Sequence, residues 1–165
     1  GESMIPKENQ IYLAYPFTEF YRQNMIPELE RELGFVSHAI SQGGIYCVRF
    51  CSIFDEENYN KMGLCWDQRY EITLNEMENC GRFVGWVPTP TRSKGRENEA
   101  IDAYHRGLDL HLLVARGIEW QSGHERLLEE CCEEKIDVIE YDEVRVDLYN
   151  KMRRYDFSKR SFYKE

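Results

Sequence analysis

Short apolar runs alternate with amphipathic or polar segments along most of the chain, and this alternation constrains the fold more than any other feature. Strand-forming residues fill five runs, which are residues 10–15, 45–50, 82–87, 109–115 and 136–141. Strands that alternate with helices form parallel β-α-β units with right-handed crossovers. The sequence therefore predicts an α/β fold of the flavodoxin-like (Rossmann-like) type, a three-layer sandwich with a five-stranded parallel sheet.

Apolar periodicity predicts the segments between the strands. A helix is expected to begin near Asn24 and to end at Gly34, because Met25, Ile26, Leu29 and Leu33 recur at helical spacing. The segment 55–63, DEENYNKMG, is expected to be a polar loop. Further helices are expected at about residues 64–80, 95–107 and 122–132. A last amphipathic helix is marked by Val144, Leu148, Met152 and Tyr155 and precedes a basic, aromatic tail.

Length and composition limit the class of protein. The chain has 165 residues, of which 42% are hydrophobic, so we expect one globular domain over residues 4–165. Gly1, Glu2 and Ser3 precede the first methionine and are interpreted as the remnant of an expression tag. No signal peptide is recognised, and no apolar run approaches the ~20 residues that span a bilayer, so no membrane partner is expected.

Charge and cysteine content narrow the partners further. A net charge of −9 argues against nucleic acid as a partner, but it does not exclude a small nucleoside or nucleotide. None of the six cysteines forms a CxxC pair, so free thiols in a reducing cytoplasm are favoured over a zinc site. We expect no metal and no cofactor.

The loops after the strands are the candidate binding segments, because ligands of this fold lie beyond the carboxyl ends of the strands. These loops are residues 16–22, 88–98 and 116–123. Near the first, Tyr15 and Phe17 could stack on a nucleobase or could pack beneath the loop. Arg22 could bind a phosphate or carboxylate, or could be solvated at the surface.

The stretch GRENEAIDAYHRG, residues 95–107, carries two carboxylates at the start of an expected helix. A first-turn acid such as Glu97 or Glu99 gains ~0.3–1 kcal/mol from the helix dipole, and this explanation alone requires no catalysis. The chain contains no phosphate-binding GxxxxGK[ST], no GxGxxG and no GxSxG sequence. His105 and His124 are expected at the surface.

The segments NEMENCGRFVGWVP and GRENEAIDAYHRGLDLHLLV are together similar to the signature of the nucleoside 2-deoxyribosyltransferase-like superfamily. That signature has an apolar strand, a Pro-containing loop, a Gly, a Glu and a helix that ends in Gly. The resemblance implies that Glu99 is a nucleophile that attacks the anomeric carbon of a sugar. It also implies that Pro88, Ser93 and Asn98 contribute to substrate binding, and that Glu97 faces solvent or helps to bind ribose.

The chain departs from this superfamily in two places. The Asp that often protonates the leaving base would fall at Thr73, which cannot act as an acid. Either Glu71 or Glu76 is therefore its substitute in the substrate site, or the leaving group needs no acid. The opening loop, AYPFTEF, lacks the glycines that form a phosphate-binding nest. Members assemble as dimers or larger oligomers, so a homo-oligomer is expected, with Ser122 as a candidate donor across the interface.

The sequence thus predicts an N-glycosidase that cleaves or transfers the base–sugar bond of a nucleoside or nucleoside 5′-monophosphate. Two alternatives stay open at this point. One is NAD glycohydrolysis, which a similar architecture with a glutamate at a helix start can perform. The other is a nucleotide-sensing module that keeps the pocket without turnover.

Overall fold

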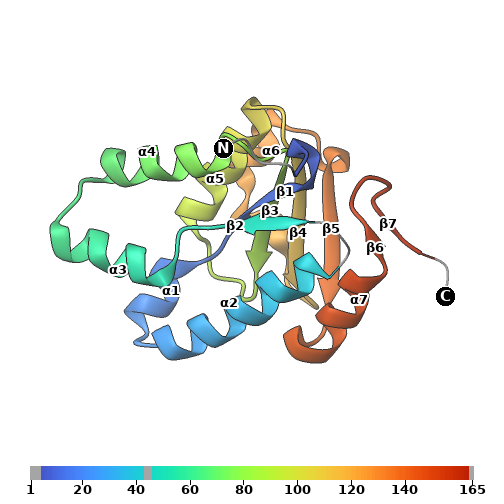
Figure 1. Cartoon of the computed structure of the whole chain (residues 1–165), viewed down its shortest axis with the longest axis horizontal. Helices are drawn as coiled ribbons and strands as arrows, with labels where there is room; N and C mark the ends of the chain where they lie inside the picture. The colour runs from blue at the N-terminus through green and yellow to red at the C-terminus, as the bar shows by residue number, and fades with distance from the viewer. Residues whose placement is uncertain (1–4, 43–45, 164–165) are drawn as a thin grey trace.

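The computed structural model describes residues 5–42 and 46–163 and contains a parallel five-stranded sheet (Figure 1). Its strands are β1 (Gln10–Ala14), β2 (Cys47–Arg49), β3 (Arg82–Val87), β4 (Asp109–Ala115) and β5 (Ile136–Tyr141). They lie in the order β2-β1-β3-β4-β5, and every neighbouring pair is parallel. This order confirms the predicted flavodoxin-like α/β fold. The presumed tag residues 1–3 and the glycine pair 43–44 lie outside the described residues.

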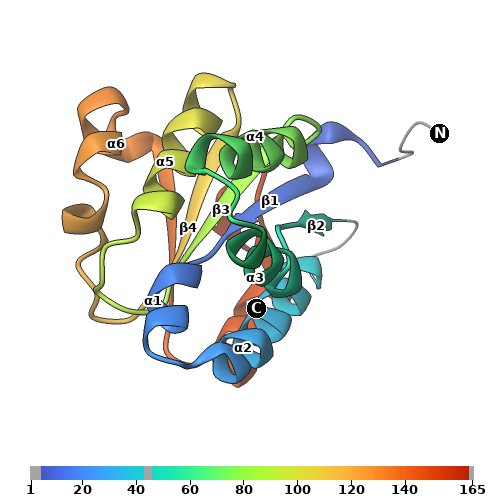
Figure 2. The same ribbon diagram turned by 90° about the vertical axis from the view of Figure 1, so that its left-hand side faces the viewer.

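Helices cover both faces of the sheet and make the fold a three-layer sandwich (Figures 1 and 2). On one face, α2 (Ile26–Ser41), a π-helical turn (Val144–Leu148) and α7 (Tyr149–Arg153) bury apolar side chains against β1, β3, β4 and β5. On the other face lie α4 (Trp66–Met77), α5 (Lys94–His105) and α6 (Glu125–Glu130). Alternate side chains of each central strand enter the two cores, as the near-continuous apolar runs require.

The prediction that Gly34 ends the second helix is wrong, because α2 continues to Ser41. Val36, Ala39 and Ile40 carry the buried face of α2 onward past the glycine. Burial of these side chains outweighs the ~1 kcal/mol that a glycine costs inside a helix. Apart from its chain neighbours and the backbone of its own helix, no atom of the described residues lies within 4 Å of the position that a Cβ on Gly34 would occupy, so the glycine serves no close packing.

The predicted polar loop 55–63 is also wrong, because α3 (Ile53–Met62) is a helix. The Ser52 side chain accepts a hydrogen bond from the Asp55 amide at 3.1 Å and so caps the helix start. Gly63, at φ 67°, ends it in the left-handed conformation. The start and stop signals are thus present in the sequence, but the apolar periodicity that usually reveals a helix is missing.

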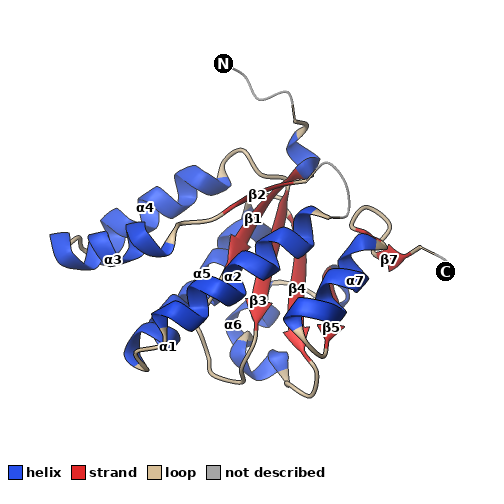
Figure 3. Cartoon of the chain, turned by 60° about the horizontal axis from the view of Figure 1, so that its bottom comes forward, coloured by secondary structure: helices blue, strands red, loops and turns tan. Residues whose placement is uncertain are grey.

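Helices α3 and α4 form a hairpin, here called the α3–α4 arm, that extends away from the sheet beside β1 and β2 (Figures 1 and 3). Arg69 of α4 joins the two helices, since its guanidinium binds Glu56 at 2.6 Å and Asn60 at 2.8 Å. Three large apolar side chains of the arm are exposed: Phe54 at 72%, Met62 at 68% and Trp66 at 59%.

Other boundaries differ more modestly. The segment 16–22, expected as a loop, contains the short helix α1 (Phe17–Arg22). The helix expected at 122–132 divides into a 3-10 turn (Trp120–Gly123) and α6. The last helix ends at Arg153, and the tail forms a small antiparallel hairpin, β6 (Tyr155–Asp156) and β7 (Ser161–Phe162). In the part of the chain that the structure describes, no helix is both long and apolar enough to cross a bilayer.

Candidate active site

Glu99 lies in the second turn of α5, the helix that follows the carboxyl end of β3. Pro88 comes directly after the strand and is half-buried. Ser93 caps α5 by accepting a hydrogen bond from the Arg96 amide at 3.3 Å, so the cap fixes where the helix begins. The start of α5 therefore places the half-buried Glu99 side chain toward β1 and α4, at the edge of the sheet where this fold binds ligands.

Residues from five segments meet around this carboxyl group. We call them the Glu99 cluster: Tyr12 and Tyr15 from β1 and its end, Cys51 after β2, Glu56 from α3, Thr73 from α4, and Arg96 and Glu99 from α5. The buried Tyr12 side chain makes polar contacts with both Glu99 and Thr73. The structure thus brings together three of the residues predicted from sequence, namely Tyr15, Thr73 and Glu99.

Burial and a second carboxylate raise the pKa of Glu99. The loss of solvent is the main cause, and the negative charge of Glu56 adds to it. The Tyr12 hydroxyl and the Arg96 guanidinium oppose the shift, and the resulting pKa of Glu99 is about 8. A carboxyl group with such a pKa is protonated in most molecules at neutral pH and ionised at higher pH. Perturbation of this size is typical of functional carboxyl groups.

Tyr15 and Cys51 bring Glu56 into the cluster. The Tyr15 hydroxyl donates a hydrogen bond to the Cys51 carbonyl oxygen, and the tyrosine ring packs edge-on against Phe50 at 6.1 Å. Burial, followed by the charge of Glu56, raises the pKa of the Tyr15 hydroxyl and of the Cys51 thiol far above their usual values. Both groups therefore keep their protons, while Glu56 faces them as the carboxylate of its ion pair with Arg69.

Arg96 carries the guanidinium group of the Glu99 cluster and is only 2% exposed. Its Nη1 atom donates to the Trp86 carbonyl oxygen at 2.9 Å. Burial lowers the pKa of Arg96 to about 10, against the opposing charges of Glu19, Glu99 and Glu97. Within the described residues its Nε atom has no hydrogen-bond partner. Arg96 is thus a fixed, buried cation close to the candidate nucleophile.

Glu97 does not face solvent, so that part of the expectation is wrong. Its carboxylate is completely buried and accepts hydrogen bonds from Arg92 Nη2 at 2.8 Å and from the Arg126 amide at 2.9 Å. Burial alone would raise the pKa of Glu97, but these bonds and one from the Leu127 amide lower it. No side chain of α6 itself caps the start of this helix. The Glu97 carboxylate accepts the hydrogen bonds of backbone amides there and so takes the place of a cap.

Phe17, Arg22 and Glu71 are among the predicted binding residues that lie outside the cluster. Phe17 is buried in the apolar core and stacks on Tyr21 at 5.5 Å, which supports the packing interpretation. Arg22 is exposed at the end of α1, and Glu71 is exposed on α4, so neither is positioned at Glu99. The predicted substitute Glu76 is likewise exposed.

Asn98 lies within α5, and Ser122 lies in the 3-10 turn that precedes α6. The Asn98 carbonyl oxygen accepts a hydrogen bond from Tyr70 at 3.1 Å, which links α4 to the residue before Glu99. The Ser122 hydroxyl donates to the Glu119 carbonyl oxygen of its own turn at 3.0 Å. Ser122 also lines a shallow surface hollow with residues of α6, and that hollow does not include Glu99.

The two histidines expected at the surface differ in their exposure to solvent. His105 is exposed, as predicted, and contacts Glu130 at 2.9 Å. His124 is fully buried, so its predicted exposure is wrong. Its Nδ1 atom lies 2.8 Å from the Trp120 carbonyl oxygen and ties the 3-10 turn to the start of α6. Burial, together with the charge of Arg96, lowers the pKa of His124 to about 4, so its ring is neutral at physiological pH.

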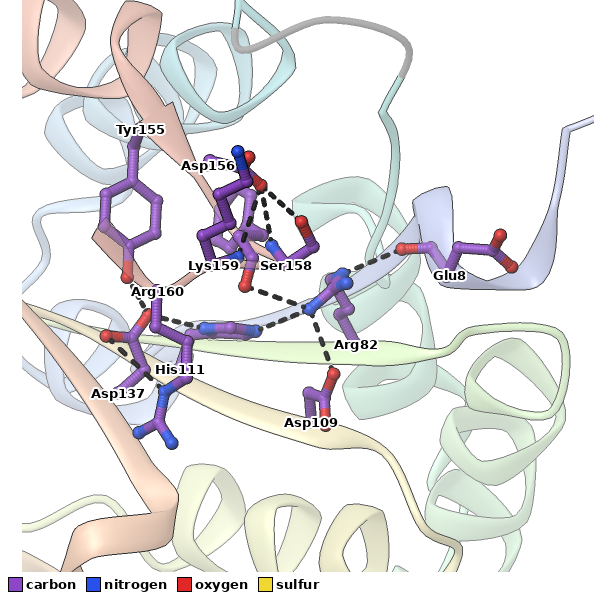
Figure 4. Close-up of polar contacts among 11 residues, drawn as sticks. Glu8, Arg82, Asp109, His111, Asp137, Tyr155, Asp156, Ser158, Lys159 and Arg160 are labelled. Atoms are coloured by element: carbon purple, nitrogen blue, oxygen red, sulfur yellow. Dashed lines mark hydrogen bonds and ion pairs between the residues drawn. The ribbon is translucent and has the colours of Figure 1, made fainter. Parts of the chain in front are cut away.

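A second polar cluster lies at the opposite end of the sheet, where the strands begin (Figure 4). Asp137 accepts hydrogen bonds from Tyr155 and, at 2.7 Å, from His111, and both partners are almost fully buried. Arg82 donates to Asp109 at 3.0 Å and to the Phe157 carbonyl oxygen at 3.4 Å. These bonds attach the C-terminal hairpin to the sheet, so we assign this cluster a structural role.

Sequence reasoning missed Tyr12, Glu56 and Arg96. Tyr12 belongs to an apolar strand run in which a tyrosine is indistinguishable from a core residue. Glu56 falls in the segment taken for a loop, although Ser52 and Asp55 carry the cap signal that would have placed it on a helix. Compared with known proteins, the sequence matches no protein-family model, and a search of curated proteins finds no significant match. Glu99 and the groups around it therefore carry the functional argument.

Proposed function

We propose that the chain is an N-glycosidase or glycosyltransferase that acts on the base–sugar bond of a nucleoside or nucleoside 5′-monophosphate. Glu99 is the nucleophile in this proposal. The observation that carries it is the convergence of five segments on one half-buried carboxyl group at the start of α5. The likeness of the surrounding segment to the nucleoside 2-deoxyribosyltransferase-like superfamily supports the choice of reaction.

The proposed reaction has two displacements at the anomeric carbon. In the first, an oxygen of the ionised Glu99 carboxylate forms a bond to the anomeric carbon as the bond to the base nitrogen breaks, and the electron pair of that bond goes to the base. In the second, water or another base attacks the same carbon and releases Glu99 as a carboxylate, and the proton of an attacking water passes to solvent. Arg96 supplies a nearby positive charge that stabilises the ionised form of Glu99. Tyr12 contacts the carboxyl group and holds its orientation.

The test uses chromatography to measure the base released from a panel of ribonucleosides, deoxyribonucleosides and their 5′-monophosphates. Glu99→Gln, which keeps the shape of the side chain, is expected to reduce turnover by about 10³-fold or more, as expected when a nucleophile is removed. Asp102→Asn, one turn further along α5, is the matched control and keeps activity. No release from any substrate, or equal release by Glu99→Gln, contradicts the proposal. Nicotinamide release from NAD alone supports the alternative of NAD glycohydrolysis.

A nucleotide-sensing module without turnover is the second candidate. Two observations favour it: Thr73 stands where the related enzymes often carry an acid, and Glu99 is protonated in most molecules at neutral pH. Calorimetry distinguishes the two functions. Tight nucleoside binding that Glu99→Gln leaves unchanged, with no product formed, supports the sensor.

We further propose that the chain forms a homodimer or a larger homo-oligomer and that it works in the cytoplasm. The exposed Phe54, Met62 and Trp66 make the α3–α4 arm the candidate interface. The six cysteines are all free thiols, which suits a reducing compartment. Sedimentation of wild type and of Trp66→Ser tests the assembly: wild type is expected to be oligomeric, and Trp66→Ser is expected to shift toward the monomer. A monomer mass for wild type contradicts the proposal.

A further inference from the structure

The surface of the α3–α4 arm is acidic as well as apolar. Residues 53–77 contain six acidic and two basic residues, and one of the two basic residues is engaged in an ion pair within the arm. Asp67 and Glu71 are exposed one helical turn apart on α4, so their carboxylates are neighbours on the helix surface. Trp66 precedes them, is 59% exposed and stacks on Tyr70. The arm therefore presents negative charge next to an exposed aromatic ring.

The C-terminal segment, residues 144–163, has the opposite charge. It contains six basic and two acidic residues, although the whole chain has a net charge of −9. Arg153 at the end of α7 and Lys159 in the turn between β6 and β7 are both exposed. Phe162 and Tyr163, at the end of the hairpin, are 43% and 52% exposed. This segment therefore presents positive charge next to exposed aromatic rings.

Both surfaces are held in place by contacts within their own chain. Arg69 and Glu56 join the two helices of the arm, and the Tyr163 amide donates to the Arg154 carbonyl oxygen at 2.7 Å at the end of the hairpin. Binding therefore requires little further ordering of either surface. The arm and the hairpin lie at opposite ends of the molecule (Figures 1 and 3), so the two cannot meet within one chain.

We propose that the C-terminal segment of one copy of the chain binds the α3–α4 arm of a second copy. The inference rests on the proposed homo-oligomer and names the two surfaces that form it; it does not depend on the glycosidase reaction. Arg153 and Lys159 face the carboxylates of Asp67 and Glu71 across the contact, and a basic side chain over the Trp66 ring adds a cation–π contact. Because the contact joins unlike surfaces, two copies exchange both contacts or several copies join in series.

A second copy suits the C-terminal segment better than nucleic acid does. The net charge of −9 repels a polyanion, whereas the arm combines carboxylates with the apolar side chains that Phe162 and Tyr163 require. Two copies also carry like net charges. Salt screens exposed charges over about 8 Å at physiological ionic strength, so the opposite charges at the contact outweigh the distant ones.

The experiment reverses the charge of each surface separately and measures self-association of the full chain by sedimentation velocity. The C-terminal variant is Arg153→Glu with Lys159→Glu, and the arm variant is Asp67→Lys with Glu71→Lys. Each alone is expected to raise the Kd of self-association about tenfold or more, because like charges then face each other. An equimolar mixture of the two variants is expected to associate again. In the mixture a reversed C-terminal segment meets a reversed arm, and an unchanged segment meets an unchanged arm.

A control variant, Lys94→Glu with Lys135→Glu, makes the same change of net charge at exposed positions on α5 and before β5. It is expected to keep the association of wild type. Calorimetry shows whether each variant is folded, and Lys159→Glu alone repeats the test with a single change in an exposed turn. Loss of association in the control as in the two variants would attribute the effect to net charge and overturn the inference.

The remaining outcomes separate this inference from the proposed assembly. An oligomeric wild type whose mass the folded C-terminal variant leaves unchanged overturns the inference and keeps the homo-oligomer. Folded variants that do not associate when mixed also overturn it, because opposite charge would then not be the cause of binding. A wild type that stays monomeric but binds a single-stranded oligonucleotide through Lys159 overturns it in favour of nucleic acid. A monomeric wild type overturns the assembly as well, and base release by Glu99 is unaffected by any of these results.

Discussion

Replacing Glu97 with alanine tests whether this residue is structural and Glu99 chemical. Its buried carboxylate accepts hydrogen bonds from the backbone amides of Arg126 and Leu127 at the start of α6. A hydrogen bond to a charged group contributes about 1.5 kcal/mol at the lower end of its range, so losing these two costs about 3 kcal/mol. The third bond, from the exposed Arg92, is left out of the sum because an exposed ion pair contributes little. For a chain of this size, that loss lowers Tm by about 6–12 °C.

Differential scanning calorimetry at pH 7 measures this effect. Glu97→Gln keeps one accepting oxygen and is expected to lose about half as much stability. Arg126→Ala is the control, since it removes an exposed side chain and leaves the backbone amide in place. A Tm for Glu97→Ala within about 2 °C of wild type would refute the capping role.

The pH dependence of stability gives a second test of the same contact. The pKa of Glu97 is lower in the folded chain than in the unfolded one, where it is about 4.3. The carboxylate therefore contributes its full stability above that value, and the contribution is lost as pH falls through the folded-state pKa. Wild type and Glu97→Gln should consequently differ less in Tm at pH 3 than at pH 7. An equal difference at both pH values contradicts the linkage.

Four further variants test backbone conformation, the pH dependence of activity and local stability. Gly34→Ala, at an unobstructed position inside α2, should raise the free energy of unfolding by about 0.5–1 kcal/mol, as denaturant titration can show. Gly107→Ala, at φ 81°, should lower it by about 1 kcal/mol, and the same sign for both variants would contradict the backbone argument. Glu56→Gln should move the rise of kcat/KM with pH to a lower pH, because removing this negative charge lowers the pKa of Glu99; an unmoved profile would show that Glu56 does not act on the nucleophile. Asp137→Asn should speed hydrogen exchange in the C-terminal hairpin more than in the central strands. Equal protection of the hairpin in wild type and Asp137→Asn would contradict the anchoring role of Asp137.

The fold could be predicted from the sequence because each strand is a distinct apolar run, and five such runs separated by crossovers leave few topologies. The errors arose where local and tertiary effects compete. Gly34 is a helix breaker by propensity, yet the sheet beneath α2 stabilises the helix through it. Helix α3 has caps but little apolar periodicity, and Arg69 of its neighbour, not the core, joins it to α4.

The candidate site could be predicted only in part. The helix start and the resemblance indicated Glu99, and the structure places Tyr15 and Thr73 beside it. The sequence could not show that Glu97 points into the protein, because its partners Arg126 and Leu127 lie about thirty residues further on. Nor could it show Glu56, whose negative charge acts on Glu99 although the two residues are far apart in the sequence and lie on different helices. Contacts of this kind depend on the whole fold.

Trapping the glycosyl-enzyme tests the central claim most directly. A nucleoside with fluorine at the sugar 2′ position destabilises the second displacement and lets the covalent intermediate accumulate, so that intact-mass and peptide-mass spectrometry can locate it. The account predicts one sugar adduct per chain, on Glu99, and no adduct on Glu99→Gln. An adduct on Glu97 or on any other residue, or base release without an adduct on Glu99, would contradict the assignment of Glu99 as the nucleophile.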